Sequence, residues 1–222
     1  MKCCIIGFPR SRSSMLLETI SLFYKIPILG EDINQLLNTF KFSDTLSTHS
    51  LLLKKLLRTK LGVIRLHPLQ ISYPTWKNAE SLELLYKDFE LYNFKHYDKI
   101  YFTFRESVSD IIASEVVAKT VGKYTYMSLD DLLKNIDPIE FNNDQMISSH
   151  IYSENLVMQL KKYLKENGIV SEDLYYNEIP NYVKTQFPTV KTNHVETHYD
   201  YKKIITNYND IFLKYKELRG SK

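Results

Sequence analysis

The sequence predicts an α/β fold: a doubly wound, mostly parallel central sheet with helices on both of its faces. Two observations support this prediction. Short apolar runs of strand length alternate along the chain with longer segments of helical periodicity. The apolar runs are nearly continuous, which is typical of strands covered on both faces, and strands that alternate with helices form parallel βαβ units. With 222 residues, the chain is predicted to be a single domain, residues 1–222.

The strands are predicted, in chain order, at 2–7, 62–67, 99–104 and 173–177. Helices are predicted at 13–24, 46–58, 78–94, 107–120, 145–167 and 200–218. In the last helix, apolar side chains from Tyr201 to Tyr215 form one stripe. The irregular stretch 121–144 is predicted to be a surface connection, with a substrate lid as the alternative.

The composition argues against several classes of protein. A net charge of +3, from 29 basic and 26 acidic residues, is too balanced for a dedicated nucleic-acid binder. No apolar run approaches the length of a transmembrane helix, and the first strand begins too close to Met1 to leave room for a signal peptide. We therefore expect a cytoplasmic protein with neither a membrane nor nucleic acid as a partner.

The two cysteines, Cys3 and Cys4, are adjacent within the first predicted strand. Adjacent residues have neither metal-ligand spacing nor a geometry suited to a mutual disulfide. Both are predicted to be buried thiols in a reducing compartment, and the sequence predicts no metal site.

The segment from Cys3 to Leu17 joins a strand to a helix through a turn that contains serines and two arginines. A helix that begins there presents unsatisfied N–H groups and the positive end of its dipole, which together bind anions. The turn is not a nucleotide-triphosphate P-loop, because Arg12 and Ser13 stand where that motif has its second glycine and its lysine. The segment predicts a phosphate or sulfate site, and an ordinary turn capped by serine is the alternative.

ProArgSerArgSerSer at 9–14 resembles the 5′-phosphosulfate-binding loop of the sulfotransferases, usually written P-[KR]-S-G-[ST]-[ST]. These enzymes transfer a sulfonate from 3′-phosphoadenosine 5′-phosphosulfate (PAPS) to an acceptor hydroxyl or amine and release adenosine 3′,5′-bisphosphate. The pattern departs from the family at Arg12, where glycine is usual, so a slightly reshaped loop is expected. The resemblance implies the P-loop-like sulfotransferase fold and a co-substrate site formed by Pro9, Arg10, Ser11, Arg12, Ser13 and Ser14.

PheArgGluSerValSerAspIleIleAlaSer at 104–114 resembles the family's 3′-phosphate-binding segment. The resemblance assigns this phosphate to Arg105 and Ser114, whose spacing of nine residues is similar to that of the bacterial trehalose-type enzymes. A guanidinium grips a phosphate bidentately, and a hydroxyl on the following helix can donate to the same group. Ser107 and Asp110 are predicted to form a capping box. A surface ion pair is the alternative for Arg105.

A third segment, TyrTyrAsnGluIle at 175–179, is similar to the family's Y-E-D-[LIM] stretch, with Asn177 in place of the usual glutamate. The resemblance implies that Tyr176 lies near the adenine, and a buried tyrosine at a strand end is the alternative. The three segments follow one another in the order expected of the family.

Two residues compete for the role of catalytic base. IleArgLeuHisPro at 64–68 resembles the K-T-H-[Lx]-P stretch of cytosolic sulfotransferases, which makes His67 one candidate, and an imidazole titrates near neutral pH. In IleProIleLeuGlyGluAsp at 26–32, Glu31 stands about where trehalose-type and Golgi relatives have a basic glutamate. A core histidine and a solvated loop carboxylate are the structural alternatives. Arg10 is expected to stabilise the charge that grows in the transition state.

Basic or titratable side chains follow three predicted strands: Arg10 the first, Arg65 and His67 the second, and Arg105 the third. Since the carboxyl ends of parallel strands share one edge of a sheet, these side chains are expected to form a pocket for a polyanion. Period-two alternation puts Arg65 and His67 on one face of their strand.

The sequence therefore predicts PAPS-dependent sulfonate transfer, without a metal, to a small-molecule or glycan acceptor. One alternative is a nucleotide-dependent phosphotransferase, which would need the P-loop lysine and a Mg²⁺ ligand. The other is a nucleotide-binding module without catalysis, against which the presence of His67 and Glu31 argues.

Overall fold

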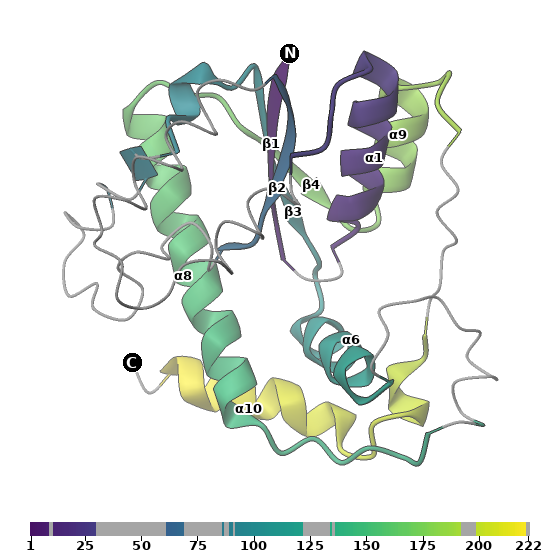
Figure 1. The fold of residues 1–222 in the computed structure, drawn as a ribbon. Helices are drawn as coiled ribbons and strands as arrows, with labels where there is room; N and C mark the ends of the chain where they lie inside the picture. Colours follow the sequence, from purple (N-terminus) through teal and green to yellow (C-terminus); the bar gives the residue numbers. More distant parts are fainter. Residues whose placement is uncertain are drawn as a thin grey trace, which may run out of the picture. The chain divides into compact units, whose positions relative to one another are not determined.

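The computed structural model describes residues 1–8, 11–29, 61–68, 86, 89–90, 92–121, 134, 136–191 and 199–220. Within these residues it is an α/β protein with a sheet of four parallel strands in the order β2-β1-β3-β4 (Figure 1). The predicted fold class is confirmed. The strands are β1 (Lys2–Gly7), β2 (Gly62–Leu66), β3 (Lys99–Phe104) and β4 (Glu172–Tyr175), and each begins and ends within two residues of its prediction.

The position of β1 explains its continuous apolar run. It lies between β2 and β3, and all six of its residues are buried. Cys3 and Cys4 are free thiols in this strand, as predicted, and neither is exposed to solvent. A strand that is paired on both edges and covered on both faces has no position for a solvated side chain.

The residue contacts divide the chain into two compact units, and each is described by itself. The first unit comprises Met1–Phe104 and Asn155–Thr192 and contains the sheet. One face of the sheet packs against α1 (Ser13–Tyr24) and α9 (Ile179–Gln186), through a core that includes Ile5, Leu16, Val63, Tyr101, Leu174 and Ile179.

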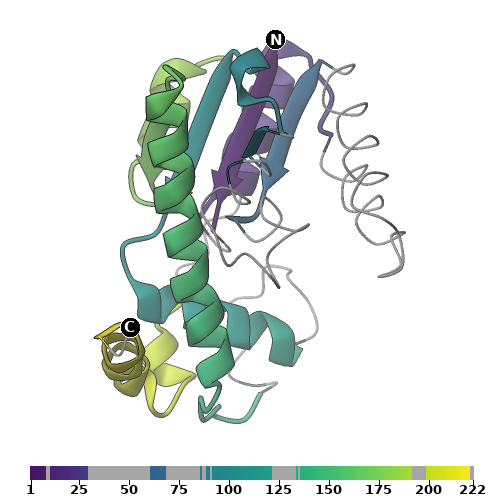
Figure 2. The same cartoon turned by 90° about the vertical axis from the view of Figure 1, so that its left-hand side faces the viewer.

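The opposite face of the sheet is covered by the C-terminal half of α8 (Asp144–Glu166), which Figures 1 and 2 show on the far side from α1 and α9. Lys161 of α8 lies with its Nζ 5.7 Å from the ring centre of Phe102 and 5.4 Å from that of Phe104, and it pairs with Asp173 of β4. Helices therefore cover both faces of the sheet, as a doubly wound fold requires.

The second unit comprises Arg105–Glu154 and Asn193–Lys222 and is mainly helical. It contains α6 (Val108–Val121), the N-terminal half of α8, the short 3₁₀ helix η2 (Tyr201–Lys203) and α10 (Tyr208–Gly220). Its core includes Ile112, Val117, Phe141, Ile147, Ile204, Ile211 and Tyr215. The single domain over residues 1–222 stays a prediction.

The prediction of one continuous helix over 200–218 is wrong. The chain is helical at η2, extended near Ile205 and helical again from Tyr208. Ile205 forms a bridge with Ile139, and the side chain of Asn207 bonds to both backbone groups of Phe141 at 2.8 and 2.7 Å. The Ile205 N–H still donates to the Tyr201 carbonyl, but the carbonyl of Ile204 and the N–H of Thr206 bond to Ile139, and periodicity alone does not reveal these long-range bonds.

The predicted α1, α6 and α8 agree with the structure within one residue at either end. The short helix α9, with a proline at its start, was not among the predictions. The helix expected at 46–58 lies outside the described residues, as does most of 78–94 and of 121–144. The short 3₁₀ helix η1 (Phe94–His96) begins at the last residue of the range 78–94.

Candidate functional site

The strand order defines one place at the edge of the sheet where a ligand is expected. The chain moves from β1 to β2 on one side and then returns past β1 to β3, so that the order reverses between β1 and β3. In open α/β sheets, ligands bind beyond the carboxyl ends of the strands at such a reversal. The turn between β1 and α1 follows Gly7 at this point, which is where the sequence predicts the anion site.

Gly7 and Ser11 fix the start of this turn. A Cβ on Gly7 would lie 2.6 Å from Oγ1 of Thr103 and 2.7 Å from Cβ of Ser13, so only glycine fits between β3 and α1. The Ser11 hydroxyl is fully buried, donates to the carbonyl of Phe8 at 2.7 Å, and lies 2.7 Å from the Thr103 hydroxyl. Ser11, which the sequence assigns to the co-substrate, therefore serves here to anchor the turn to β3.

Arg12 occupies the position just before α1. Its φ of 59° and ψ of 17° lie in the left-handed region, so the residue keeps a conformation that glycine favours. Its guanidinium carbon lies 3.9 Å from the ring centre of Tyr176, and its Nη1 donates to the carbonyl oxygen of Tyr176 at 2.9 Å. Two residues that the sequence assigns to the co-substrate are thus in direct contact, although they are 164 positions apart.

Ser13 and Ser14 form the first turn of α1. The first backbone bond of the helix runs from the N–H of Leu16 to the carbonyl of Arg12, which leaves the N–H groups of the preceding residues without a helical partner. Ser13 is buried beside Gly7. Both serines therefore lie at the positive end of the helix dipole, where an anion is stabilised.

Arg65 of β2 reaches the same helix start. Its Nη1 donates to Oγ of Ser14. Although Arg65 is exposed as a whole residue, partial desolvation of its guanidinium by the surrounding protein lowers the pKa of Arg65 from its usual value while leaving it cationic at neutral pH. Among the residues that the structure describes, no carboxylate forms an ion pair with Arg65. A cation without such a partner beside a helix N-terminus is suited to an anion.

The sequence placed Arg65 at the rim of the pocket but did not include it in the co-substrate site. The alternation of side chains between the two faces of β2 could have indicated this role of Arg65. Ile64 and Leu66 are buried, whereas Arg65 is exposed and lies on the face that carries Val63, which packs with α1. A basic side chain on that face therefore points toward the start of α1.

His67 directly follows β2, beside the end of β1, and it is half-buried. Of the two proposed bases it is the one that the structure describes. Glu31, Pro9 and Arg10 lie outside the described residues. Their roles stay predictions.

Arg105 and Ser114 belong to the second unit. The side chain of Arg105 is 9% exposed, and its Nη2 lies 3.4 Å from Oδ2 of Asp110. The other carboxylate oxygen of Asp110, Oδ1, accepts a hydrogen bond from Tyr208 at 2.5 Å. The sequence offers a surface ion pair as the alternative to phosphate binding; Arg105 does form an ion pair with a neighbour, although its own side chain is buried. Ser114 is buried within α6.

The capping prediction for α6 is confirmed at the serine. The N–H of Asp110 donates to Oγ of Ser107 at 3.1 Å, and α6 begins at Val108.

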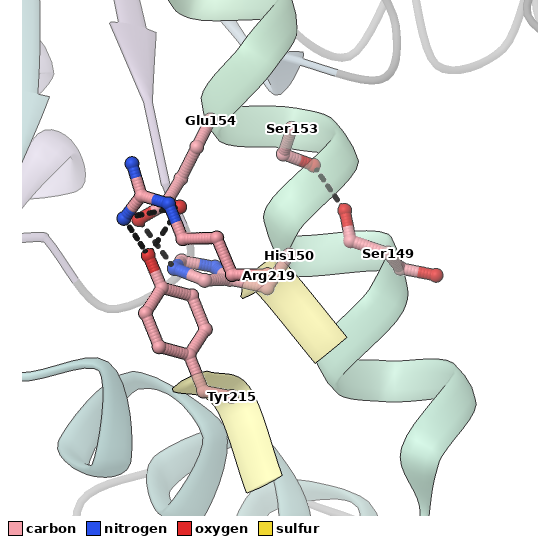
Figure 3. A network of polar contacts seen from close by, with 6 residues as sticks. All are labelled: Ser149, His150, Ser153, Glu154, Tyr215 and Arg219. Atoms are coloured by element: carbon pink, nitrogen blue, oxygen red, sulfur yellow. Dashed lines mark hydrogen bonds and ion pairs between the residues drawn. The ribbon is translucent and has the colours of Figure 1, made fainter. Parts of the chain in front are cut away.

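The second unit also contains a cluster of four titratable side chains from α8 and α10 (Figure 3). Glu154 lies 3.4 Å from Nε2 of His150, accepts a hydrogen bond from Tyr215 at 2.6 Å, and lies 3.7 Å from Nη1 of Arg219. Burial alone raises the pKa of Glu154, but hydrogen bonds from His150 and Tyr215, with the charges of His150 and Arg219, outweigh it and lower the pKa. Burial and the bond to Glu154 raise the pKa of Tyr215 to about 12.

Searches against protein-family models and against curated proteins found no match to the chain. The resemblance to sulfotransferases therefore rests on the sequence segments alone. Within the described part of the chain, no helix is both long enough and apolar enough to cross a membrane.

Proposed function

We propose that the chain is a sulfotransferase that moves a sulfonate from PAPS to a hydroxyl or amine of a small-molecule or glycan acceptor. The observation that carries the proposal is the contact of the Arg65 guanidinium with Ser14 in the first turn of α1. This contact lies where the strand order reverses and directly after the segment that resembles the phosphosulfate-binding loop. A cation, a helix N-terminus and two hydroxyls are the groups that a phosphosulfate needs.

The residues of the first unit fit the 5′ end of PAPS without a P-loop lysine. Arg65 supplies charge at the start of α1, and Ser13 and Ser14 supply backbone N–H groups and hydroxyls. Arg10 belongs to the same proposed site by resemblance to the family. Arg105 and Ser114 are proposed, from sequence alone, as ligands of the 3′-phosphate.

In the proposed reaction, the acceptor oxygen or nitrogen attacks sulfur, a new bond to sulfur forms, and the bond between sulfur and the bridging phosphate oxygen breaks. The electron pair of that bond stays on the phosphate of adenosine 3′,5′-bisphosphate. The acceptor proton moves to a base, for which His67 and Glu31 are the candidates. Arg65, Arg10 and the N–H groups of α1 stabilise the charge that grows on the leaving phosphate.

The proposed compartment is the cytoplasm. Cys3 and Cys4 are buried free thiols, and unpaired thiols are usual where glutathione keeps them reduced.

A thermal-shift series with PAPS, adenosine 3′,5′-bisphosphate, AMP and ATP with Mg²⁺ tests the proposal. We expect the two 3′-phosphorylated nucleotides to raise the melting temperature most, because a ligand that binds only the folded chain stabilises it. A preference for ATP with Mg²⁺ would favour the phosphotransferase instead. Chromatography then follows the release of adenosine bisphosphate from PAPS with a panel of hydroxyl and amine acceptors. Nucleotide binding without such release under any acceptor would favour the non-catalytic module.

A further inference from the structure

Arg12 breaks three local rules of helix formation at once. It has a left-handed φ of 59°, although it carries a Cβ. It occupies the N-cap of α1, where Ser, Thr, Asp or Asn is preferred, and its side chain makes no capping bond. It is also a cation at the positive end of the helix dipole, where anions are preferred. Residues that violate local preferences are held there by other contacts, and such violations concentrate at functional sites.

Two contacts that hold Arg12 come from Tyr176. The guanidinium stacks on the tyrosine ring at 3.9 Å and donates to the tyrosine carbonyl at 2.9 Å, so one residue engages both its face and its edge. Tyr176 is itself fixed, because its N–H donates to the carbonyl of Phe104 at 2.8 Å and the residue is only 9% exposed. The turn before α1 is thereby tied to the residue that follows β4, across the end of β3.

This arrangement changes the meaning of two sequence assignments. A guanidinium that stacks on a ring and donates to the carbonyl of the same residue is oriented by both contacts. The ring face of Tyr176 that Arg12 covers is also closed to a nucleobase. The geometry therefore assigns both residues to the support of the turn.

We propose that Arg12 is a positioning residue, clamped to Tyr176, that holds the first turn of α1 where Ser13, Ser14 and Arg65 converge on the anion. The clamp replaces the glycine that the family has at this position with a side-chain anchor that glycine cannot provide. This inference rests on the proposed function for the identity of the anion, but the clamp itself is a feature of the first unit alone.

The test uses the full chain and two probes, adenosine 3′,5′-bisphosphate and inorganic sulfate, with calorimetry as the measurement. Tyr176→Leu removes the ring, and Arg12→Lys keeps the charge and the Cβ but loses the planar group that stacks. We expect each variant to weaken binding of both probes by about tenfold. We expect the double variant to be no weaker than the poorer single variant, because both remove the same clamp.

Tyr176→Phe is the matched control, since it keeps the ring and the backbone carbonyl, and we expect it to bind like the wild type. Denaturant unfolding of all four variants checks that each is folded under the conditions of the titration. A loss of stability through packing would affect both the Phe and the Leu variant at position 176. Wild-type affinity in Tyr176→Phe together with weaker binding in Tyr176→Leu would instead identify the ring face as the group that binding requires.

Three results would overturn the inference: wild-type affinity in Arg12→Lys, which would make Arg12 a direct ligand through its charge; wild-type affinity in Tyr176→Leu; or losses that add in the double variant. The proposed function fails separately. If the wild type binds sulfate with this pattern of losses but not the nucleotide, the clamp stands and the PAPS assignment falls. If the wild type binds neither probe, both fall.

Discussion

Each unit of the chain contains an arginine that lies over a tyrosine ring, and the two pairs are used in opposite ways. In the first unit, Arg12 lies 3.9 Å from the ring centre of Tyr176 at the N-terminus of α1, against the helix dipole. In the second unit, Arg219 lies 5.5 Å from the ring centre of Tyr215, in the last turn of α10, where a cation is favoured.

The two arginine–tyrosine pairs also differ in the charged groups that surround them. Arg219 and Tyr215 both contact the carboxylate of Glu154, so the charge of the cluster is balanced within the unit (Figure 3). Near Arg12, the neighbouring cation Arg65 forms no ion pair with a described carboxylate. A cluster that satisfies local rules and balances its own charge holds a fold together, whereas a residue that breaks those rules, beside a cation without an ion pair to a described carboxylate, is suited to an anion site.

The largest effect is expected at the proposed base. His67→Ala and Glu31→Gln are to be made separately, and the variant that removes the true base should lower turnover of PAPS by roughly 10²–10⁴-fold. Its affinity for adenosine 3′,5′-bisphosphate should stay nearly unchanged, because the base acts on the acceptor. If Glu31 orients His67, the double variant should be no worse than the poorer single one. Near-normal turnover in both variants would contradict the mechanism.

The next effect contrasts the two units directly. Arg65→Ala and Arg10→Ala should each weaken the binding of adenosine 3′,5′-bisphosphate by about tenfold or more. A charge-assisted contact contributes about 1.5–3 kcal/mol. Arg219→Ala is the matched control from the second unit and should lower only the free energy of unfolding. Calorimetry and denaturant unfolding measure the two quantities. A loss of nucleotide affinity in Arg219→Ala equal to that in Arg65→Ala would end the distinction between the two arginine clusters.

How far the sequence predicts these regions depends on whether the cause is local. The four strands follow from continuous apolar runs, and α1 and the cap of α6 at Ser107 follow from periodicity and capping chemistry. The break at Ile205 depends on a bridge to Ile139, and the stack of Arg12 on Tyr176 joins residues far apart in the chain. No local sequence pattern encodes such contacts, so these two features could not be predicted from the sequence and are seen only in the structure.

A smaller effect concerns the balance of charge in the second unit. The pKa of Glu154 is lowered in the folded chain, so its contribution to stability is fully present above the ordinary value of 4.5 and is lost as the pH falls through the folded value. Glu154→Gln should cost about 1–3 kcal/mol of unfolding free energy at pH 7, since it weakens bonds to a charged acceptor. The difference in unfolding free energy between the wild type and Glu154→Gln should shrink as the pH falls below 4.5 and through the lowered pKa of the folded chain.

Glu115→Gln is the control for that measurement, because Glu115 forms a partly exposed ion pair with Lys119 at 2.8 Å on α6. Such pairs contribute about 0–1 kcal/mol. A difference between wild type and Glu154→Gln that is constant from pH 7 to pH 3 would show that the carboxylate charge does not stabilise the unit.

The smallest effect is expected from thiol reagents. Burial raises the pKa of Cys3 to about 12 and also raises that of Cys4, so neither thiol is ionised at neutral pH. We expect no labelling of the native chain by a thiol-specific reagent over the time in which the denatured chain reacts with two equivalents, as mass spectrometry would detect. Rapid labelling of the native chain would mean that β1, on which the anion site depends, opens readily.

The central claim is that the start of α1 holds the 5′ end of a 3′-phosphorylated adenosine nucleotide. Calorimetric titration of adenosine 3′,5′-bisphosphate and of AMP, into the wild type and into Arg65→Ala and Arg105→Ala, tests it most directly. We expect one site on the wild type, tighter for the bisphosphate than for AMP. Arg65→Ala should weaken both ligands by about tenfold, and Arg105→Ala should weaken only the bisphosphate. Absence of binding to the wild type, or an affinity that Arg65→Ala leaves unchanged, would contradict the account.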